Sequence, residues 1–197
     1  EPPKGRIYLS CNSYKEMAEW CLPATLSGQY DKCLDNSGED AKRFLKGGYF
    51  KHFLVKYDES NDMQKKMLEA SKKAKKDMEA RRHVFMAQCN DSYWHGVFGG
   101  LYLPHLRASV YKHLIEAEKI LDPKKEFVEG KLYDINMDGA EEAILSNSLM
   151  KAYFMLNEGG VLYELDYKPS STNIMATLRR RYEGYHDKIK MASSVEQ

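Results

Sequence analysis

Apolar side chains recur at spacings of three and four residues through the middle of the chain, a pattern typical of amphipathic helices. The first helix is predicted from Ser60 onward, on a face formed by Met63, Met67, Ala70, Ala74 and Met78. A second is predicted over residues 79–89, with Val84 and Phe85 facing inward. A third begins at Pro104, a residue favoured in the first helical turn, and runs to residue 121, where Asp122 and Pro123 end it. Three helices with short links predict a small helical bundle.

The period changes from 3.6 to 2 after about residue 125, which indicates strands. Hairpin-like strands are predicted over residues 131–135, 142–146 and 149–154. A further strand over residues 161–167 follows the turn signal Gly159-Gly160 and is closed by Pro169. In this strand, Val161, Tyr163, Leu165 and Tyr167 alternate with Leu162, Glu164 and Asp166. The predicted fold class is therefore α+β, with a helical bundle followed by the opening strands of an antiparallel sheet domain.

The first 48 residues have a mixed pattern. A short strand is predicted over residues 5–9, then a helix over 14–20 with Ser13 as its cap and Glu16 in the reciprocal capping position. A polar loop is predicted over 35–40 and a helical turn over 41–46, stopped by Gly47-Gly48. We therefore divide the chain into a connector (1–48), a helical bundle (49–125) and a sheet domain (126–197). The start at Glu1-Pro2-Pro3 and the end soon after the strands indicate a fragment of a longer polypeptide.

Composition and charge exclude several classes of protein. The net charge of +1 gives the chain no general attraction to nucleic acid, and acidic residues interrupt the lysine-rich face of the first helix, which indicates a solvated surface. The mean hydropathy of −0.64 and the lack of a long apolar run argue against a membrane span. Four cysteines occur without a Cys-x-x-Cys pair, so a zinc site is not expected. Free thiols in a reducing compartment are the simplest expectation, which favours the cytoplasm.

The chemistry-bearing side chains are densest over residues 87–107, between the second and third predicted helices. This segment combines aromatic side chains, two histidines, an acid, an amide and three glycines. Trp and Tyr offer flat faces that suit sugar rings, Asp and Asn can bond hydroxyl groups, and glycines let the backbone approach a ligand closely. The composition is that of a carbohydrate subsite. The alternative is that these aromatics are core residues at a helix junction and that Gly99-Gly100 is only a turn.

A second constellation lies between two predicted strands. Oxygen-bearing side chains occupy the first, third, fifth and ninth positions of this loop: Asp134, Asn136, Asp138 and Glu142. Such hard oxygen ligands suit Ca²⁺ in preference to Zn²⁺. The loop is not an EF-hand, because Leu145 stands at the twelfth position where a bidentate Glu is needed. Two interpretations remain: a structural calcium site, or a polar hairpin turn built on Asp-Gly.

Residues 87–107 resemble, almost without interruption, the carboxyl-proximal signature of glycoside hydrolase family 57, the family of α-amylases and 4-α-glucanotransferases. Residues 14–23, 47–68 and 164–169 resemble the same family in the same order, so the resemblance covers nearly the whole chain. It implies an active site on a seven-stranded barrel upstream of this chain, then the helical region, then a β-sandwich domain that begins near residue 126. The chain's own missing barrel and an α-1,4-glucan or maltooligosaccharide would be its partners.

The resemblance also implies which residues meet the sugar. A retaining glycosidase needs two carboxyl groups about 5 Å apart, and in this family they are a Glu and an Asp on the barrel, upstream of residue 1. The family's Asp and Trp that line the sugar site map onto Asp91 and Trp94, with His95 as a weaker neighbour. We expect part of a 4-α-glucanotransferase or α-amylase that requires no cofactor, with the resemblance leaning to the transferase. The alternatives are a non-catalytic carbohydrate-binding or structural module and a degenerate family member.

Overall fold

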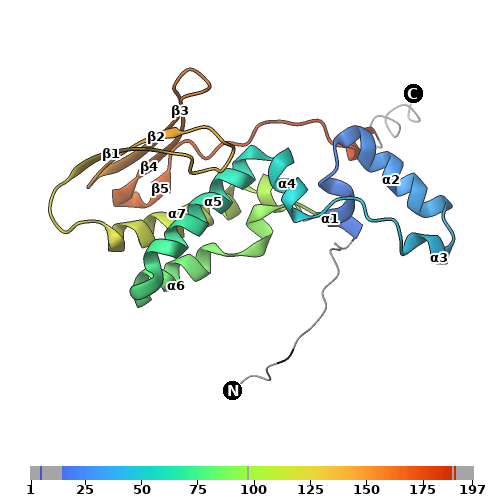
Figure 1. The fold of residues 1–197 in the computed structure, drawn as a ribbon, viewed down its shortest axis with the longest axis horizontal. Coiled ribbons are helices and arrows are strands. Elements are labelled where there is room, and N and C mark those ends of the chain that lie inside the picture. The colour runs from blue at the N-terminus through green and yellow to red at the C-terminus, as the bar shows by residue number, and fades with distance from the viewer. Residues whose placement is uncertain (1–4, 6–14, 97, 188, 190–197) are drawn as a thin grey trace. The chain divides into compact units, whose positions relative to one another are not determined.

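The computed structural model describes residues 5, 15–96, 98–187 and 189 (Figure 1). The chain divides into two compact units, one formed by residues up to Lys56 together with those from Arg181 onward, and one formed by Tyr57–Arg180. Apart from Gly5, the strand predicted over residues 5–9 lies outside the described residues, and so does the predicted cap Ser13. None of the helices in the described part of the chain combines the length and apolar character needed to cross a bilayer.

The helices with assigned bounds in the described part of the first unit are α1 (Lys15–Trp20), α2 (Ala24–Asn36), α3 (Glu39–Lys42) and α4 (Phe50–Lys56). The helix predicted over 14–20 is confirmed as α1. The polar loop predicted over 35–40 is wrong, because α2 extends into it and α3 begins within it. Helix α2 escaped prediction because it buries only Ser27 and carries Gly28 in its interior, so it shows no apolar face. The predicted turn over 41–46 is likewise shorter than expected and ends with α3.

The second unit begins with three helices that match the predicted bundle: α5 (Asp58–Lys73), α6 (Met78–Ala87) and α7 (Pro104–Leu121). A 3-10 turn over Ala74–Lys76 separates α5 from α6, and the Asp77 side chain caps α6 by accepting a hydrogen bond from the Ala80 amide at 2.9 Å. This break corrects two expectations. Met78 and Phe85, predicted to face inward, are 74% and 59% exposed, because α6 starts a new helix with its own apolar face.

A five-stranded antiparallel meander follows the helices, in the order β1 (Val128–Tyr133), β2 (Glu142–Asn147), β3 (Met150–Met155), β4 (Val161–Tyr167) and β5 (Thr172–Asn173). Helices followed by an antiparallel sheet confirm the α+β class. In Figure 1 the sheet lies along one side of α5 and α7, and α6 lies on their other side. The register aligns Lys131 with Ile144, Ile144 with Tyr153, and Tyr153 with Glu164, so these side chains share one sheet face.

The sheet face that packs toward the helices is unusually polar. Its small apolar cluster consists of Ile135, Ile144 and Tyr153, with Tyr133 and Tyr163 packed against it. On β4 the most deeply buried side chains are Glu164 and Asp166, which are 3% and 0% exposed. The alternation along β4 therefore identified a strand correctly, but the acidic residues occupy the inner positions. The cations that make this burial possible come from α5 and β3.

Candidate functional site

The connection between α6 and α7 is built from two 3-10 turns, η2 (Asn90–Tyr93) and η3 (Gly100–Tyr102). The Leu101 amide donates to the Trp94 carbonyl at 2.8 Å and thereby ties the two turns together. Gly100 makes this possible, because it has φ +44° and a Cβ there would lie 2.1 Å from the Trp94 carbonyl oxygen and 2.7 Å from that of Asp91. Only glycine fits at this contact. The backbone at Asp91 and Trp94 is therefore fixed by its close contact with Gly100 and Leu101.

All three helices of the bundle anchor this connection. The Ser60 hydroxyl on α5 donates to the Tyr93 carbonyl oxygen, and the Tyr93 hydroxyl donates to the Ala87 carbonyl oxygen of α6 at 2.6 Å. Arg107 on α7 donates to the Leu101 carbonyl oxygen at 2.6 Å. These hydrogen bonds are made by buried residues, so they fix the described part of the connection to the helices although it contains little regular structure.

A cavity of about 280 Å³ opens beside this connection and contains two of the three predicted substrate residues. Its walls are formed by Asp91, Trp94, Gly96, Phe98, Gly100, Leu103, His105 and Leu106. The Asp91 carboxylate can accept hydrogen bonds from hydroxyl groups, the indole and phenyl rings can cover an apolar ligand face, and the imidazole can donate or accept. This combination suits a ligand with both hydroxyl groups and apolar CH faces.

His95, the third predicted residue, is absent from the cavity wall. It is 2% exposed, and its Nε2 lies 2.6 Å from the Tyr57 hydroxyl. The Tyr102 ring meets the imidazole edge-on, with 4.9 Å between ring centroids. His95 therefore lies behind the connection and packs it against the start of α5.

Among the residues of the cavity wall that were not predicted as substrate residues, an aromatic ring and an imidazole stand out. Phe98, which is 91% exposed, and His105, in the first turn of α7, both belong to the segment that the sequence singled out. Pro104 was the signal that could have identified His105. Because Pro104 begins α7, His105 lies in the first helical turn, which borders the same cavity as Asp91 and Trp94. No comparable signal separated Phe98 from the core aromatics.

The loop over residues 134–142 is ordered by its own side chains. The Asp134 carboxylate accepts hydrogen bonds from the amides of Asp138 at 3.1 Å and Gly139 at 3.0 Å. Asn136 Oδ1 accepts from the Asp138 amide at 3.0 Å, and Asp138 Oδ1 accepts from the Ala140 amide at 2.8 Å. Gly139 has φ +96°, a conformation that favours glycine. The three oxygen-bearing side chains thus stabilise the turn of the loop by accepting hydrogen bonds from its backbone amides.

The fourth predicted ligand, Glu142, is fully buried at the end of this loop. Its Oε2 accepts from the Ile135 amide at 2.9 Å, while its Oε1 is buried without a hydrogen-bond partner. Burial raises the pKa of this carboxyl. The Asn61 amide of α5 donates to the Asn136 carbonyl at 2.7 Å, which fixes the loop to the helices. Within the described residues, no three or more His, Cys, Asp or Glu side chains are grouped so as to hold a metal ion.

Comparison with known proteins places these features in a family. Residues 48–121 match the model described as "Alpha-amylase/4-alpha-glucanotransferase, middle domain", and residues 134–197 match the model of the C-terminal domain of the same family. The chain is 40% identical to alpha-amylase 1 of Dictyoglomus thermophilum over 206 residues, which cover 99% of this chain and 30% of that protein. It is 41% identical to the 4-alpha-glucanotransferase of Thermococcus litoralis over 190 residues, which cover 94% of this chain and 28% of that protein.

The fold agrees with that relationship. The crystal structure of the 4-alpha-glucanotransferase from Thermococcus litoralis superimposes with a TM-score of 0.85 at 40% identity, covering all of this chain and 31% of that one. The chain thus spans about 30% of the length of the curated relatives it matches. The two family models lie side by side along the chain and follow its helices and its sheet. The chain belongs to the α-amylase/4-α-glucanotransferase family, glycoside hydrolase family 57, and carries its middle domain and C-terminal domain sequences.

Proposed function

We propose that this chain is part of an enzyme that processes α-1,4-glucans with retention of configuration, as a 4-α-glucanotransferase or an α-amylase. Its relatives bear both names at similar identity, and we favour the transferase, the name of the solved structure that matches the whole chain. The role of this chain is to line the sugar-binding site with Asp91 and Trp94 and to support a catalytic barrel. The chemistry itself requires no cofactor, since two carboxyl groups suffice.

The observation that carries the proposal is the placement of Asp91 and Trp94 on the wall of one cavity. A carboxylate beside an indole binds a sugar through hydroxyl groups on one side and a CH face on the other. A site that bonds hydroxyl groups also discriminates against ligands that lack them. His95 contributes by bonding Tyr57 and holding the backbone of the connection in place.

The catalytic carboxyl pair belongs outside this chain in our proposal. Among the described residues on the cavity wall, Asp91 is the one carboxylate, whereas retention requires two carboxyl groups about 5 Å apart. The pair is supplied by a barrel in the remaining part of an intact enzyme, and the cavity faces the sugar bound there. Isolated from that barrel, the chain is inactive.

The test uses the intact enzyme with Asp91→Asn and Trp94→Ala. Each variant should lower kcat/KM for a maltooligosaccharide by at least about tenfold, equal to ~1.4 kcal/mol of transition-state stabilisation. The matched controls are Asp35→Asn, an exposed acid on α2, and Phe85→Ala, a largely exposed aromatic on α6 outside the cavity wall. Kinetics near wild type for both Asp91→Asn and Trp94→Ala would reject the proposed role.

The alternative function is a non-catalytic carbohydrate-binding module, favoured by the cavity wall, which brings a carboxylate, an indole and a phenyl ring together within residues 91–106. Calorimetric titration of the isolated chain with maltoheptaose separates the two. Strong binding that Trp94→Ala abolishes, without any turnover by the intact protein, supports the module. Turnover by the intact protein supports the enzyme.

We further propose that the loop over residues 134–142 binds a structural Ca²⁺ ion. The buried Oε1 of Glu142, which has no hydrogen-bond partner, supports this, because a buried carboxylate oxygen is costly unless something compensates it. Asp134, Asn136 and Asp138 supply further oxygen atoms of the type that Ca²⁺ prefers. The ion would stabilise the conformation of the β1–β2 connection and the hydrogen bond between this loop and Asn61.

We also propose that the enzyme works in the cytoplasm. Cys21, Cys33 and Cys89 are free thiols in the structure, and free thiols persist in reducing compartments. Mass spectrometry after alkylation of the protein purified under native conditions tests this: labelling of these thiols only after reduction would contradict it.

A further inference from the structure

A buried cluster of charges joins the helices to the sheet. The ammonium group of Lys66 on α5 is 2% exposed and makes ion pairs with both Glu164 and Asp166 on β4. Glu164 and Asp166 are two residues apart, so both side chains point to the same sheet face. A third member of this alternating series, Lys168, donates to Asp122 at the end of α7 at 2.6 Å. The charged residues of the family-like segment 164–169 thus attach the sheet to α5 and α7.

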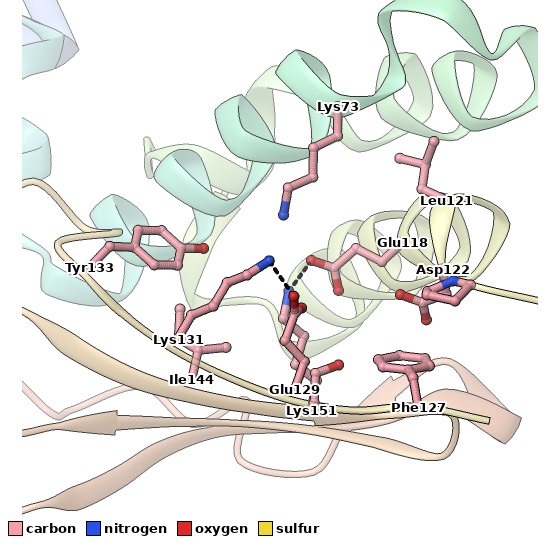
Figure 2. Close-up of a pocket in the computed structure, with 12 residues that line it drawn as sticks. Lys73, Glu118, Leu121, Asp122, Phe127, Glu129, Lys131, Tyr133, Ile144 and Lys151 are labelled. Carbon is pink, nitrogen blue, oxygen red and sulfur yellow. Dashed lines mark hydrogen bonds and ion pairs between the residues drawn. The ribbon is translucent and has the colours of Figure 1, made fainter. Parts of the chain in front are cut away.

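A second buried ion pair lies beside the first. Lys151 on β3 contacts Glu118 on α7 at 2.6 Å, and Figure 2 shows the two side chains meeting across the gap between helix and strand. The Tyr153 ring lies between the two pairs, with its centroid 4.8 Å from Lys66 Nζ and 5.0 Å from Lys151 Nζ. Both ammonium groups are therefore placed over one aromatic ring, which is a favourable position for a buried cation.

The charges of this cluster do not balance. Two ammonium groups, Lys66 and Lys151, face three carboxyl groups, those of Glu118, Glu164 and Asp166, and all five residues are at most 8% exposed. The titratable side chains around them come from every adjoining element: Asp62, Glu69 and Lys73 of α5, Tyr111 of α7, Glu129, Lys131 and Tyr133 of β1, Tyr153 of β3 and Tyr163 of β4. Lys73 is 43% exposed and pairs with Glu69, and Lys131 pairs with Glu129, so these two cations leave the imbalance in place.

The hydrogen bonds show the same excess of acceptors. Oδ1 of Asp166 and Oε2 of Glu118 are both buried without a partner. An ionised carboxylate can only accept hydrogen bonds, whereas a protonated one also donates. One proton on a carboxyl group of the cluster would convert an acceptor into a donor and equalise the charges.

The pKa values identify which carboxyl groups hold that proton. Burial raises the pKa of Asp166 to about 8 and also raises that of Glu164, although Lys66 opposes the shift. Burial acts on Glu118 in the same direction, but Lys151 and Lys66 prevail and lower its pKa to about 2. Glu118 is therefore ionised, and Glu164 and Asp166 compete for a single ammonium group.

We infer that this unit takes up one proton when it folds, that Glu164 and Asp166 share it, and that losing it at alkaline pH weakens the contact between the helices and the sheet. A carboxyl pKa raised in the folded state stabilises the protein at low pH, and this stability is lost as pH rises through the folded value. The folding equilibrium constant should fall up to tenfold per pH unit as pH rises toward about 8, and then level off.

The test is urea unfolding of this chain between pH 6 and 9.5, compared with Asp166→Asn. The amide keeps the shape of the side chain and removes the surplus charge. We expect the wild type to lose stability steadily from pH 6 to about 8 and to level off above that, and Asp166→Asn to lose clearly less, so that the variant equals or exceeds the wild type at pH 9. Glu126→Gln, an exposed acid before β1, should follow the wild type. Parallel curves for wild type and Asp166→Asn would overturn the inference.

Infrared spectroscopy supplies a second readout that a purely structural ion pair would not change. The wild type at pH 7 should show the carbonyl stretch of a protonated carboxyl, which disappears at pH 9.5 and in Asp166→Asn or Glu164→Gln. Asp62 needs its own control, because burial and the neighbouring Asp58 and Glu59 raise its pKa to about 7. Burial also raises the pKa of Glu142, so a background that combines Asp62→Asn with Glu142→Gln removes both signals. If the band is absent from this background at pH 7, or survives in both cluster variants, the shared proton does not exist.

Discussion

Gly100 determines where Asp91 and Trp94 lie, because its backbone packs directly against the carbonyl oxygens of both residues. The Trp94 carbonyl oxygen would be 2.1 Å from a Cβ at this position, and φ +44° is itself unfavourable for other residues. The geometry of the proposed sugar site therefore depends on a residue with no side chain.

Replacing Gly100 by Ala should destabilise the second unit by at least about 2 kcal/mol, since the clash is with backbone atoms and the left-handed conformation adds strain. Gly28→Ala is the matched control: Gly28 lies inside α2 with open space around its Cβ position, and alanine there should stabilise by about 0.5–1 kcal/mol. Urea unfolding of both variants measures the two effects. A Gly100→Ala variant as stable as wild type would contradict the described contact.

At the scale of single residues, the sequence located the functional segment but not the direction of each side chain. Asp91 and Trp94 line the cavity, whereas their neighbour His95 is buried against Tyr57. The difference arises because η2 ends at Tyr93 and the backbone becomes extended at Trp94, so successive side chains point to different sides. Neither composition nor the family resemblance contains that information.

At the scale of elements, the helical period was a reliable guide wherever apolar burial drives the helix. It placed α7 at the observed residues, 104–121, but carried the pattern of α5 too far, through Met78. The interruption there is polar: Asp77 caps a new helix by accepting from the Ala80 amide. On β4, the two-residue period identified the strand but could not show that Lys66, distant in sequence, forms ion pairs with its acidic side chains.

The proposed Ca²⁺ site in the loop between β1 and β2 can be tested by thermal unfolding. If it binds Ca²⁺, calcium at about 100 times its Kd should stabilise the chain by ~2.7 kcal/mol, or raise Tm by roughly 5 °C or more relative to a chelator. Glu142→Gln should abolish the difference, and Glu141→Gln, which changes the exposed neighbour, should preserve it. A Tm that is equal in calcium and in chelator would count against the site.

At the scale of the whole molecule, this chain carries two consecutive domain sequences of its family. Its relatives are about three times as long, and their shared fold over this region is shown by the TM-score of 0.85. The order of helices and sheet followed from the change in hydrophobic period. The two compact units did not, because the pairing of Lys56 with Glu183, 127 residues later, leaves no local pattern in the sequence.

The most direct test of the proposed sugar site is a crystal structure of the intact enzyme with a bound maltooligosaccharide. Our account predicts that the Asp91 carboxylate accepts a hydrogen bond from a sugar hydroxyl at 2.5–3.0 Å or so, and that the Trp94 ring packs against a sugar ring in the cavity it lines. A sugar chain bound at the catalytic carboxyl pair, with neither Asp91 nor Trp94 in contact with any of its rings, would contradict the account.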